Sequence, residues 1–226
     1  MTRARPVIAI DGPAGVGKST TARVIAQRLG YILVDTGALY RGIALAARDR
    51  VLSWDDEPAM ATLAGEVSLS FIAGAEGAPR LQVDGVDRAD EIRTPAIASG
   101  ASQVSAYSGV RRALLDIQRE LGRDGGVVLE GRDIGTVVFP DAEVKLFLTA
   151  SAEERARRRV NDLQTRGIKA DPEEILAQMK ARDTADSTRP IAPLRPAEDA
   201  VILDSTSLDL EVVVEHVLEL VRASGS

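Results

Sequence analysis

The sequence predicts an α/β fold with a parallel central sheet. Several short apolar runs, of which Val7 to Ile10 is the first, lack polar alternation and are typical of strands buried on both faces. A Gly-rich turn and a helical segment follow this run, and strand and helix patterns alternate after it. Only the middle of the chain, at about residues 63–105, changes to the alternating pattern of antiparallel strands. These observations predict a central sheet, surrounding helices and an inserted α+β unit.

The opening segments repeat the order strand, helix, strand, helix. A helix is expected from Thr20 to Leu29, ending at Gly30, because glycine readily adopts the left-handed conformation that ends many helices. Ile32 to Val34 is expected to form a second buried strand, and Ala38 to Arg48 a second helix.

The expected insert contains a hairpin. Val67 to Phe71 alternates strictly between apolar and polar residues, as a strand with one buried face does. Leu81 to Val83 is followed by Asp84-Gly85, a dipeptide typical of hairpin turns. Two helical segments follow, at about residues 95–105 and 110–121.

The last third returns to buried strands and helices. Ser151 and Glu154 form the pattern of a capping box at the start of a helix that ends near Arg166, before Gly167. Asp171-Pro172 begins the next helix with a capping acid and a proline in the first turn. The remaining strands are expected at residues 127–129, 144–148 and 201–203, and the last helix at residues 210–222.

The composition excludes several kinds of chemistry. The 226 residues include no Cys and a single His, so a disulfide framework, a thiol nucleophile and a multi-His metal site are excluded. The formal net charge of -6 argues against a general nucleic-acid binder. No apolar run approaches the roughly 20 residues that span a bilayer, and the first residues lack the pattern of a secretory signal. We therefore expect a cytoplasmic monomer that binds small molecules, and neither nucleic acid nor membrane.

A phosphate-binding motif lies between the first predicted strand and helix. Residues 12–19 fit G-x-x-x-x-G-K-[ST], in which glycines let backbone N–H groups approach phosphate oxygens. Lys18 is expected to reach the β- and γ-phosphates of ATP, and the Ser19 hydroxyl to ligand Mg²⁺. The alternative is a Gly-rich turn without a ligand. The motif predicts a three-layer P-loop NTPase fold whose cofactor-binding residues are Gly12, Pro13, Ala14, Gly15, Val16, Gly17, Lys18, Ser19 and Thr20.

Two polar clusters follow predicted strands, at the sheet edge where ligands bind in open α/β folds. The first spans residues 35–41 and would place Thr36 and Arg41 against a ligand. The second, at residues 130–133, combines an acid suited to orienting Mg²⁺ with Arg132 for a phosphate and Asp133 for a base amino group. Ordinary strand-to-helix turns are the alternative for both clusters.

Charged residues gather on two predicted helices near the C-terminus. Four arginines crowd residues 155–159, an arrangement that destabilises a helix unless solvent or a bound anion neutralises it. On the next helix Arg182, Asp186 and Arg189 are spaced to share one face. Solvated charged faces are the alternative, but beside a P-loop these clusters favour a helical lid at about residues 151–190.

The order of these motifs resembles that of bacterial cytidylate kinases. The most specific match is the segment from Gly131 to Pro140, and the resemblance spans nearly the whole chain. It implies transfer of the γ-phosphoryl group of ATP to CMP or dCMP. The other matching segments are residues 12–19, 35–41, 92–94, 101–104, 110–111, 182–186 and 192–194.

The resemblance also implies roles and a division of the chain. Lys18, Arg132, Arg158 and Arg159 would be the catalytic residues, stabilising the charge of the transferring group. The substrate-binding residues would be Thr36, Arg41, Ser102, Arg111, Arg132, Asp133, Arg182, Asp186 and Arg189. Residues 1–62 and 106–226 would form the P-loop kinase core, and residues 63–105 an inserted monophosphate-binding α+β subdomain.

Two alternatives remain open from the sequence. One is a P-loop kinase acting on another monophosphate or a small metabolite. The other is a non-catalytic switch that senses ATP through the P-loop, and such a switch would show no acceptor-dependent turnover.

Overall fold

The structure is a computed structural model that describes residues 3–74, 79–165 and 167–224. The chain divides into two compact units, one formed by Met1–Tyr31 and Gly125–Ser226 and the other by Ile32–Asp124. Each unit has its own sheet and its own packed helices.

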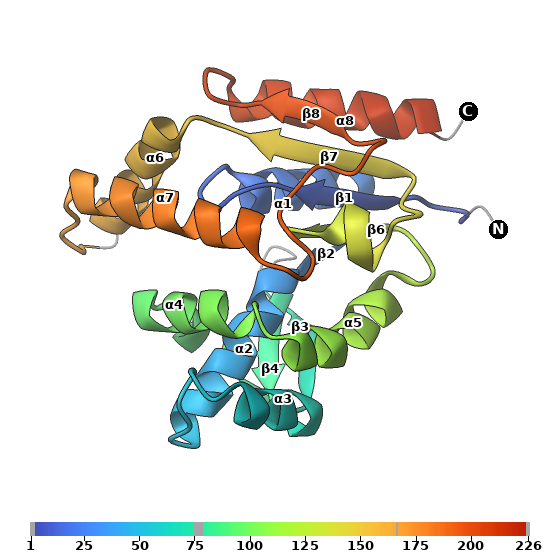
Figure 1. Cartoon of the computed structure of the whole chain (residues 1–226). Coiled ribbons are helices and arrows are strands. Elements are labelled where there is room, and N and C mark those ends of the chain that lie inside the picture. The colour runs from blue at the N-terminus through green and yellow to red at the C-terminus, as the bar shows by residue number, and fades with distance from the viewer. Residues whose placement is uncertain (1–2, 75–78, 166, 225–226) are drawn as a thin grey trace. The chain divides into compact units, whose positions relative to one another are not determined.

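The first unit contains parallel strands in the order β6-β1-β7-β8, which are labelled in Figure 1. Every residue of β1 and β6 is buried, as the unalternated apolar runs predicted. Because the strands are parallel, their C-terminal ends lie at the same edge of the sheet, and β1 and β6 end there at the paired residues Asp11 and Gly131. The strands span β1 (Val7–Asp11), β6 (Val127–Gly131), β7 (Val144–Thr149) and β8 (Val201–Asp204).

Helices of the first unit fall into two pairs, which can be followed in Figure 1. In one pair, α1 (Lys18–Leu29) packs on β6 and against α8 (Leu210–Ser224), which in turn packs on β7. In the other, α6 (Ala152–Thr165) packs against α7 (Pro172–Thr188). A single π-helical turn, η3 (Ile134–Val138), follows β6. All these α-helices were predicted, but the predicted end of α6 at Arg166 lies outside the described residues.

The ends of the predicted helices are partly confirmed. Gly30 ends α1 in the left-handed conformation with φ 62°, as expected. The Ser151 hydroxyl accepts the Glu154 N–H at 3.2 Å, which is one half of the predicted capping box. The reciprocal half is wrong, because the Ser151 N–H donates to Thr206 Oγ1 at 3.0 Å and the Glu154 carboxylate binds arginines instead.

The second unit combines an antiparallel sheet with helices. Its sheet has the order β3-β4-β5, and the turn between β4 and β5 has positive φ at both Asp84 and Gly85, which confirms the predicted hairpin. The elements are β2 (Ile32–Asp35), α2 (Thr36–Asp49), α3 (Glu57–Glu66), β3 (Leu69–Ala73), β4 (Pro79–Val83), β5 (Val86–Asp87), η2 (Glu91–Arg93), α4 (Pro95–Val104) and α5 (Ser108–Gly122).

The core of the second unit forms around α2. Leu39 and Ile43 on this helix are completely buried, α2 packs against α4, and α3 packs against α5. The unit therefore includes residues 32–62 and 106–124 as well as the predicted insert at 63–105, because these flanking helices supply much of its core. The expectation that all of Ile32 to Val34 is buried is wrong: Ile32, the first residue of its strand, is 64% exposed.

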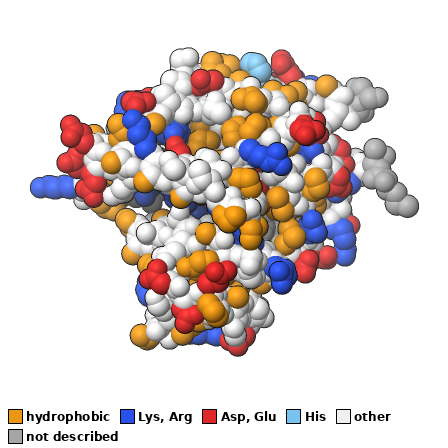
Figure 2. Space-filling view, viewed as in Figure 1, with side chains coloured by type: hydrophobic (Ala, Val, Ile, Leu, Met, Phe, Trp, Pro, Cys, Tyr) orange, Lys and Arg blue, Asp and Glu red, His pale blue; other side chains and the backbone are white. Residues whose placement is uncertain are grey.

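The surface carries both signs of charge in close proximity. Figure 2 shows acidic and basic side chains interspersed over the face in view. Many exposed arginines pair with carboxylates, as Arg28 does with Glu211 and Glu215. Across residues 3–74, 79–165 and 167–224, the structure contains no helix of the length and apolarity that would cross a bilayer.

Candidate nucleotide-binding site

The predicted phosphate-binding loop connects β1 to α1, and Lys18 is the first residue of α1. Lys18 is 5% exposed, and its ammonium group donates to the Pro13 carbonyl oxygen at 2.8 Å. Burial lowers the pKa of Lys18 to about 7, and the positive charges of Arg132 and Arg182 contribute to this lowering. The structure thus brings Lys18, Arg132 and Arg182 into one electrostatic neighbourhood within the first unit.

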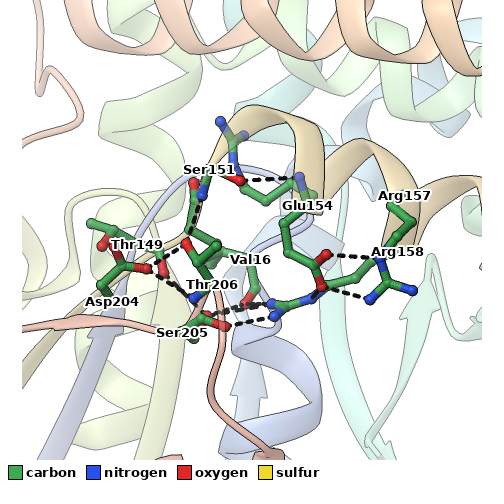
Figure 3. A network of polar contacts seen from close by, with 11 residues as sticks. Val16, Thr149, Ser151, Glu154, Arg157, Arg158, Asp204, Ser205 and Thr206 are labelled. Carbon is green, nitrogen blue, oxygen red and sulfur yellow. Dashed lines mark hydrogen bonds and ion pairs between the residues drawn. The ribbon is translucent and has the colours of Figure 1, made fainter.

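Carbonyl groups of the loop are held by side chains from distant segments. The Val16 carbonyl accepts from Arg158 Nη1 at 3.1 Å and from the Ser205 hydroxyl at 3.4 Å. Arg158 also donates to the Ser205 carbonyl at 2.6 Å and pairs with Glu154 at 2.8 Å. Figure 3 shows this network, which joins the loop, α6 and the segment after β8.

A cleft of about 450 Å³ lies beside this network in the first unit. Gly17 and Thr20 of the loop and α1 form part of its wall, and Arg158 forms another part. The segment from Ser205 to Leu210, which includes hydroxyl-bearing and apolar residues, lines another part. The cleft therefore offers both polar and apolar contacts directly next to the phosphate-binding loop.

A buried carboxylate holds the turn after β6. Asp11 ends β1, is 5% exposed, and accepts the N–H groups of Ile134 at 2.9 Å and Gly135 at 2.8 Å. Burial raises the pKa of Asp11 to about 6, although these two hydrogen bonds oppose the rise. Asp11, which directly precedes the phosphate-binding loop, thereby connects the end of β1 to the segment that carries Arg132 and Asp133.

The turn after β6 is also tied to α7 and the segment that follows. Arg132 Nε donates to Asp186 Oδ2 at 2.9 Å, and Arg189 Nη2 lies 3.5 Å from Asp133 Oδ1. Arg189 Nε donates in addition to the Ala192 carbonyl at 2.6 Å. Four of the predicted substrate-binding residues, Arg132, Asp133, Asp186 and Arg189, are therefore directly connected.

The two predicted lid arginines differ in their surroundings. Arg158 is engaged with the loop and with Ser205 as described, whereas Arg159 pairs with Asp162 at 2.9 Å on the same helix. The side chain of Arg159 is 34% exposed. In this conformation Arg158 contacts the phosphate-binding loop and Arg159 faces partly outward.

The remaining predicted substrate-binding residues belong to the second unit. Thr36, 3% exposed, begins α2, and Arg41 on the same helix pairs with Asp35 at 2.5 Å. Arg111 on α5 lies with its guanidinium carbon 5.5 Å from the centre of the Tyr40 ring and donates to the Ser105 carbonyl at 3.1 Å. These contacts bring Arg111 to the face of α2 that carries Tyr40. Ser102 lies on α4.

Three residues of the site were not assigned a role from the sequence. They are Asp11, Arg155, which donates to the Ala14 carbonyl, and Ser205. Asp11 was detectable in principle, because an acid that directly precedes a phosphate-binding loop at the end of a buried strand requires partners. Arg155 was predicted only as one of four crowded arginines and Ser205 gave no local signal, because the loop carbonyls that they bind lie 141 and 189 positions away in the chain.

Comparison with known proteins decides the family. The family model for cytidylate kinase matches residues 8–223. The chain belongs to the cytidylate kinase family. The cytidylate kinase of Geobacter sp. (strain M21) is 52% identical over 92% of this chain and 89% of its own, and that of Syntrophotalea carbinolica is 49% identical over 95% and 91%. The cytidylate kinase of Pseudomonas aeruginosa (strain PAO1) is 47% identical over 100% of this chain and 99% of its own.

Membership of the cytidylate kinase family makes the chain a phosphotransferase. A solved structure of an uncharacterized protein from Eubacterium ventriosum covers 97% of this chain and 99% of its own, with a TM-score of 0.52 and 12% identity. At that identity the likeness concerns the fold alone. The predicted α/β fold with its parallel central sheet is confirmed.

The donor set at this loop suits the metal that kinases generally use. The Ser19 hydroxyl lies in the first turn of α1, and the Glu130 carboxylate lies at the end of β6. Oxygen ligands are those that Mg²⁺ prefers, and it commonly keeps several waters while binding one or two protein ligands plus phosphates. Ser19 and Glu130 fit that mode, whereas both oxygens of Asp11 are already occupied by backbone N–H groups.

Proposed function

We propose that this protein transfers the γ-phosphoryl group of ATP to CMP or dCMP, giving ADP and CDP or dCDP. The observation that carries the proposal is the connection between a phosphate-binding loop and an acceptor-type cluster within one unit. Asp11 makes that connection, since it precedes the loop and binds the backbone of the turn that carries Arg132 and Asp133. Membership of the cytidylate kinase family supports the choice of a pyrimidine monophosphate as acceptor.

The donor phosphates would bind at the loop of residues 12–19. Backbone N–H groups and the N-terminus of α1 favour anionic oxygens, and Lys18 would leave the Pro13 carbonyl to contact the β- and γ-phosphates. Ser19 and Glu130 would hold Mg²⁺ or its waters, and Mg²⁺ would neutralise charge on the phosphates. Thr20 would line the same site from the next position of α1.

The base of ATP would occupy the cleft beside Arg158 and Ser205. The cleft adjoins the loop, so a nucleotide whose phosphates lie on the loop can place its base there. Ser205, Thr206 and nearby backbone groups would offer hydrogen bonds to the base.

The acceptor would be bound by the residues that the family resemblance predicts. Arg41, Arg132 and Arg189 would bind its phosphate, and Arg182 and Asp186 its sugar. Asp133, Arg111 and Ser102 would read cytosine, because a carboxylate accepts from its amino group and an arginine donates to its ring acceptors. Uracil would present an acceptor to the carboxylate and be disfavoured. Thr36 would lie near the acceptor.

The chemical step requires charge stabilisation more than proton transfer. The attacking group is a phosphate oxygen that is already anionic, so no dedicated general base is needed. Lys18, Arg132, Arg158 and Arg159 would stabilise the negative charge of the transferring group. For this Arg158 would exchange its bond to the Val16 carbonyl for one to a phosphate oxygen.

A coupled assay of ADP release over a panel of nucleoside monophosphates tests the proposal. We expect turnover with CMP and dCMP, and much slower turnover with UMP and dTMP. Turnover confined to another acceptor would favour the alternative kinase reading. Nucleotide binding without turnover on any acceptor would favour the ATP-sensing switch.

A further inference from the structure

One buried arginine joins three segments of the first unit. Arg155 on α6 is 4% exposed, and its Nη1 donates to the Ala14 carbonyl of the phosphate-binding loop at 3.1 Å. Its two terminal nitrogens also contact both carboxylate oxygens of Asp183 on α7, at 3.1 and 2.5 Å. Its Nε donates to the Ala150 carbonyl, just before α6, at 3.1 Å. A planar guanidinium suits such a set of fixed acceptors, whereas a lysine ammonium does not.

The bond to the Ala14 carbonyl sets the direction of a loop N–H. In a trans peptide the carbonyl of one residue and the N–H of the next point in opposite directions, and the described residues contain no cis peptide. Fixing the Ala14 carbonyl toward Arg155 therefore fixes the Gly15 N–H on the opposite side of the peptide. The N–H groups of such a loop are the groups that bind phosphate oxygens.

The bond to Asp183 sets the position of α7 relative to the same loop. A side-chain carbon added to Gly15 would overlap the terminal methyl group of Met179, so α7 packs directly on the loop. Arg182 and Asp186, both predicted to contact the acceptor, lie on α7 on either side of Asp183 in the sequence. The Arg155 guanidinium thus contacts both the phosphate-binding loop and the helix that carries the predicted acceptor-binding residues.

We propose that Arg155 and Asp183 are positioning residues of phosphoryl transfer. Arg155 orients the loop peptide that binds donor phosphates, and through Asp183 it fixes α7 so that its acceptor residues are aligned with that loop. The inference rests on the proposed function only for the alignment of the acceptor residues on α7. The orientation of the loop peptide requires nothing beyond ATP binding at the loop.

The pair has a matched control in the same two helices. Lys180 on α7 pairs with Glu153 on α6 at 3.1 Å, but these side chains are 57% and 65% exposed. An exposed ion pair of this kind contributes little, whereas hydrogen bonds to a buried charged group contribute more. Lys180→Ala therefore removes an ion pair between α6 and α7 without touching the loop.

The test uses Asp183→Asn and Arg155→Lys beside Lys180→Ala. We expect the first two to weaken the affinity for a non-hydrolysable ATP analogue about tenfold and to raise the KM for CMP by a similar factor. The double variant should be no worse than either single variant, because the two side chains act as one pair. Lys180→Ala should stay within about twofold of the wild type in both measurements.

Affinity and KM distinguish positioning from mere stabilisation. A purely structural contact would lower the melting temperature and the active fraction, and the folded molecules would keep wild-type affinity and KM. Asp183→Asn and Arg155→Lys with wild-type analogue affinity and wild-type KM would overturn the inference, whatever their melting temperatures. If the wild type turned over no monophosphate, the proposed function would fail. Analogue affinity alone would then decide: weakening in Asp183→Asn but not Lys180→Ala supports positioning, and equal affinity overturns it.

Discussion

Individual residues of this protein perform tasks that depend on their burial. Lys18 and Asp11 both lie at the phosphate-binding loop, and burial shifts the pKa of each toward neutrality. Neutral forms become accessible because a low-dielectric surrounding penalises charge. Both groups therefore titrate near physiological pH, and ligand binding or unfolding changes their protonation.

Lys18→Ala should abolish phosphoryl transfer with little loss of fold. The buried Lys18 has a pKa of about 7, so at about pH 8 it is mostly neutral before the nucleotide binds. An anionic donor raises this pKa again, so binding should take up most of a proton. Calorimetry of the ATP analogue in buffers of different ionisation enthalpy measures that uptake.

The Lys18 prediction is checked against the variant itself. Lys18→Ala should show the proton exchange of the nucleotide alone, without the extra uptake. Equal proton exchange in the two proteins would contradict a neutral Lys18 in the free enzyme.

Asp11 makes stability depend on pH in the opposite sense to a salt-bridged acid. Its pKa is raised from 3.8 to about 6, so the folded state holds a proton that the unfolded state has lost. The contribution of Asp11 to the free energy of unfolding is therefore highest below about pH 4 and falls as the pH rises to about 6. Relative to Asp11→Asn, the wild type should lose on the order of 2 kcal/mol of its free energy of unfolding as the pH rises over that range. Urea unfolding of both proteins across it would show this, and a constant difference would contradict it.

At the scale of elements, close backbone approaches fix the loop between β1 and α1. Gly12 has φ 149°, and a side-chain carbon there would overlap the Leu148 carbonyl oxygen of β7. That obstacle is backbone, which cannot rotate away as a flexible side chain does. Gly30 at the end of α1 also has a positive φ, 62°, but nothing lies within 4 Å of its added carbon.

Gly12→Ala should therefore destabilise the protein by about 3 kcal/mol or more, because backbone strain and overlap add. Gly30→Ala should cost only about 1 kcal/mol, since the left-handed backbone conformation is the only penalty there and no atom overlaps the added carbon. Urea unfolding followed by circular dichroism measures both, and a similar cost for the two variants would show that the approach of Gly12 to β7 is unimportant.

At the scale of the whole molecule, the single tryptophan reports on one unit. Trp54 belongs to the second unit, where its indole N–H donates to the Ala44 carbonyl at 3.0 Å and its own carbonyl accepts from the Tyr107 hydroxyl at 3.0 Å. A side-chain carbon on Gly100 of α4 would overlap the indole. Trp54 is therefore in contact with the helix that also carries Ser102.

CMP should change the emission of Trp54 more than an ATP analogue does. The acceptor would bind Ser102, Arg111 and Arg41 of the second unit, whereas the donor would bind the loop in the first. Fluorescence titrations with each ligand alone measure the two effects, and Trp54→Phe supplies the blank. An equal response to the analogue would contradict the assignment of acceptor residues to the second unit.

The local features of this protein follow from short patterns in its sequence. Unalternated apolar runs predicted β1 and β6, a dipeptide predicted the hairpin turn, and the spacing of glycines with Lys18 predicted the loop between strand and helix. Each of these depends on neighbours within a few residues, so the signal is contained in a short window. The resemblance to cytidylate kinases, which the family model confirms, rested on such windows in a fixed order.

Which side chains hold the site together depends on how distant segments pack in the fold. Arg158 was predicted as a lid arginine, yet its bond to Val16 spans 142 positions in the sequence. Glu154 fits a capping box locally, but nearby arginines bind its carboxylate and Thr206 accepts the Ser151 N–H. Hydrogen-bond partners are chosen by proximity in space, and a buried donor must find whichever acceptor the packing of distant segments provides. Arg155 therefore lies between the loop and α7, a position that no local sequence pattern predicts.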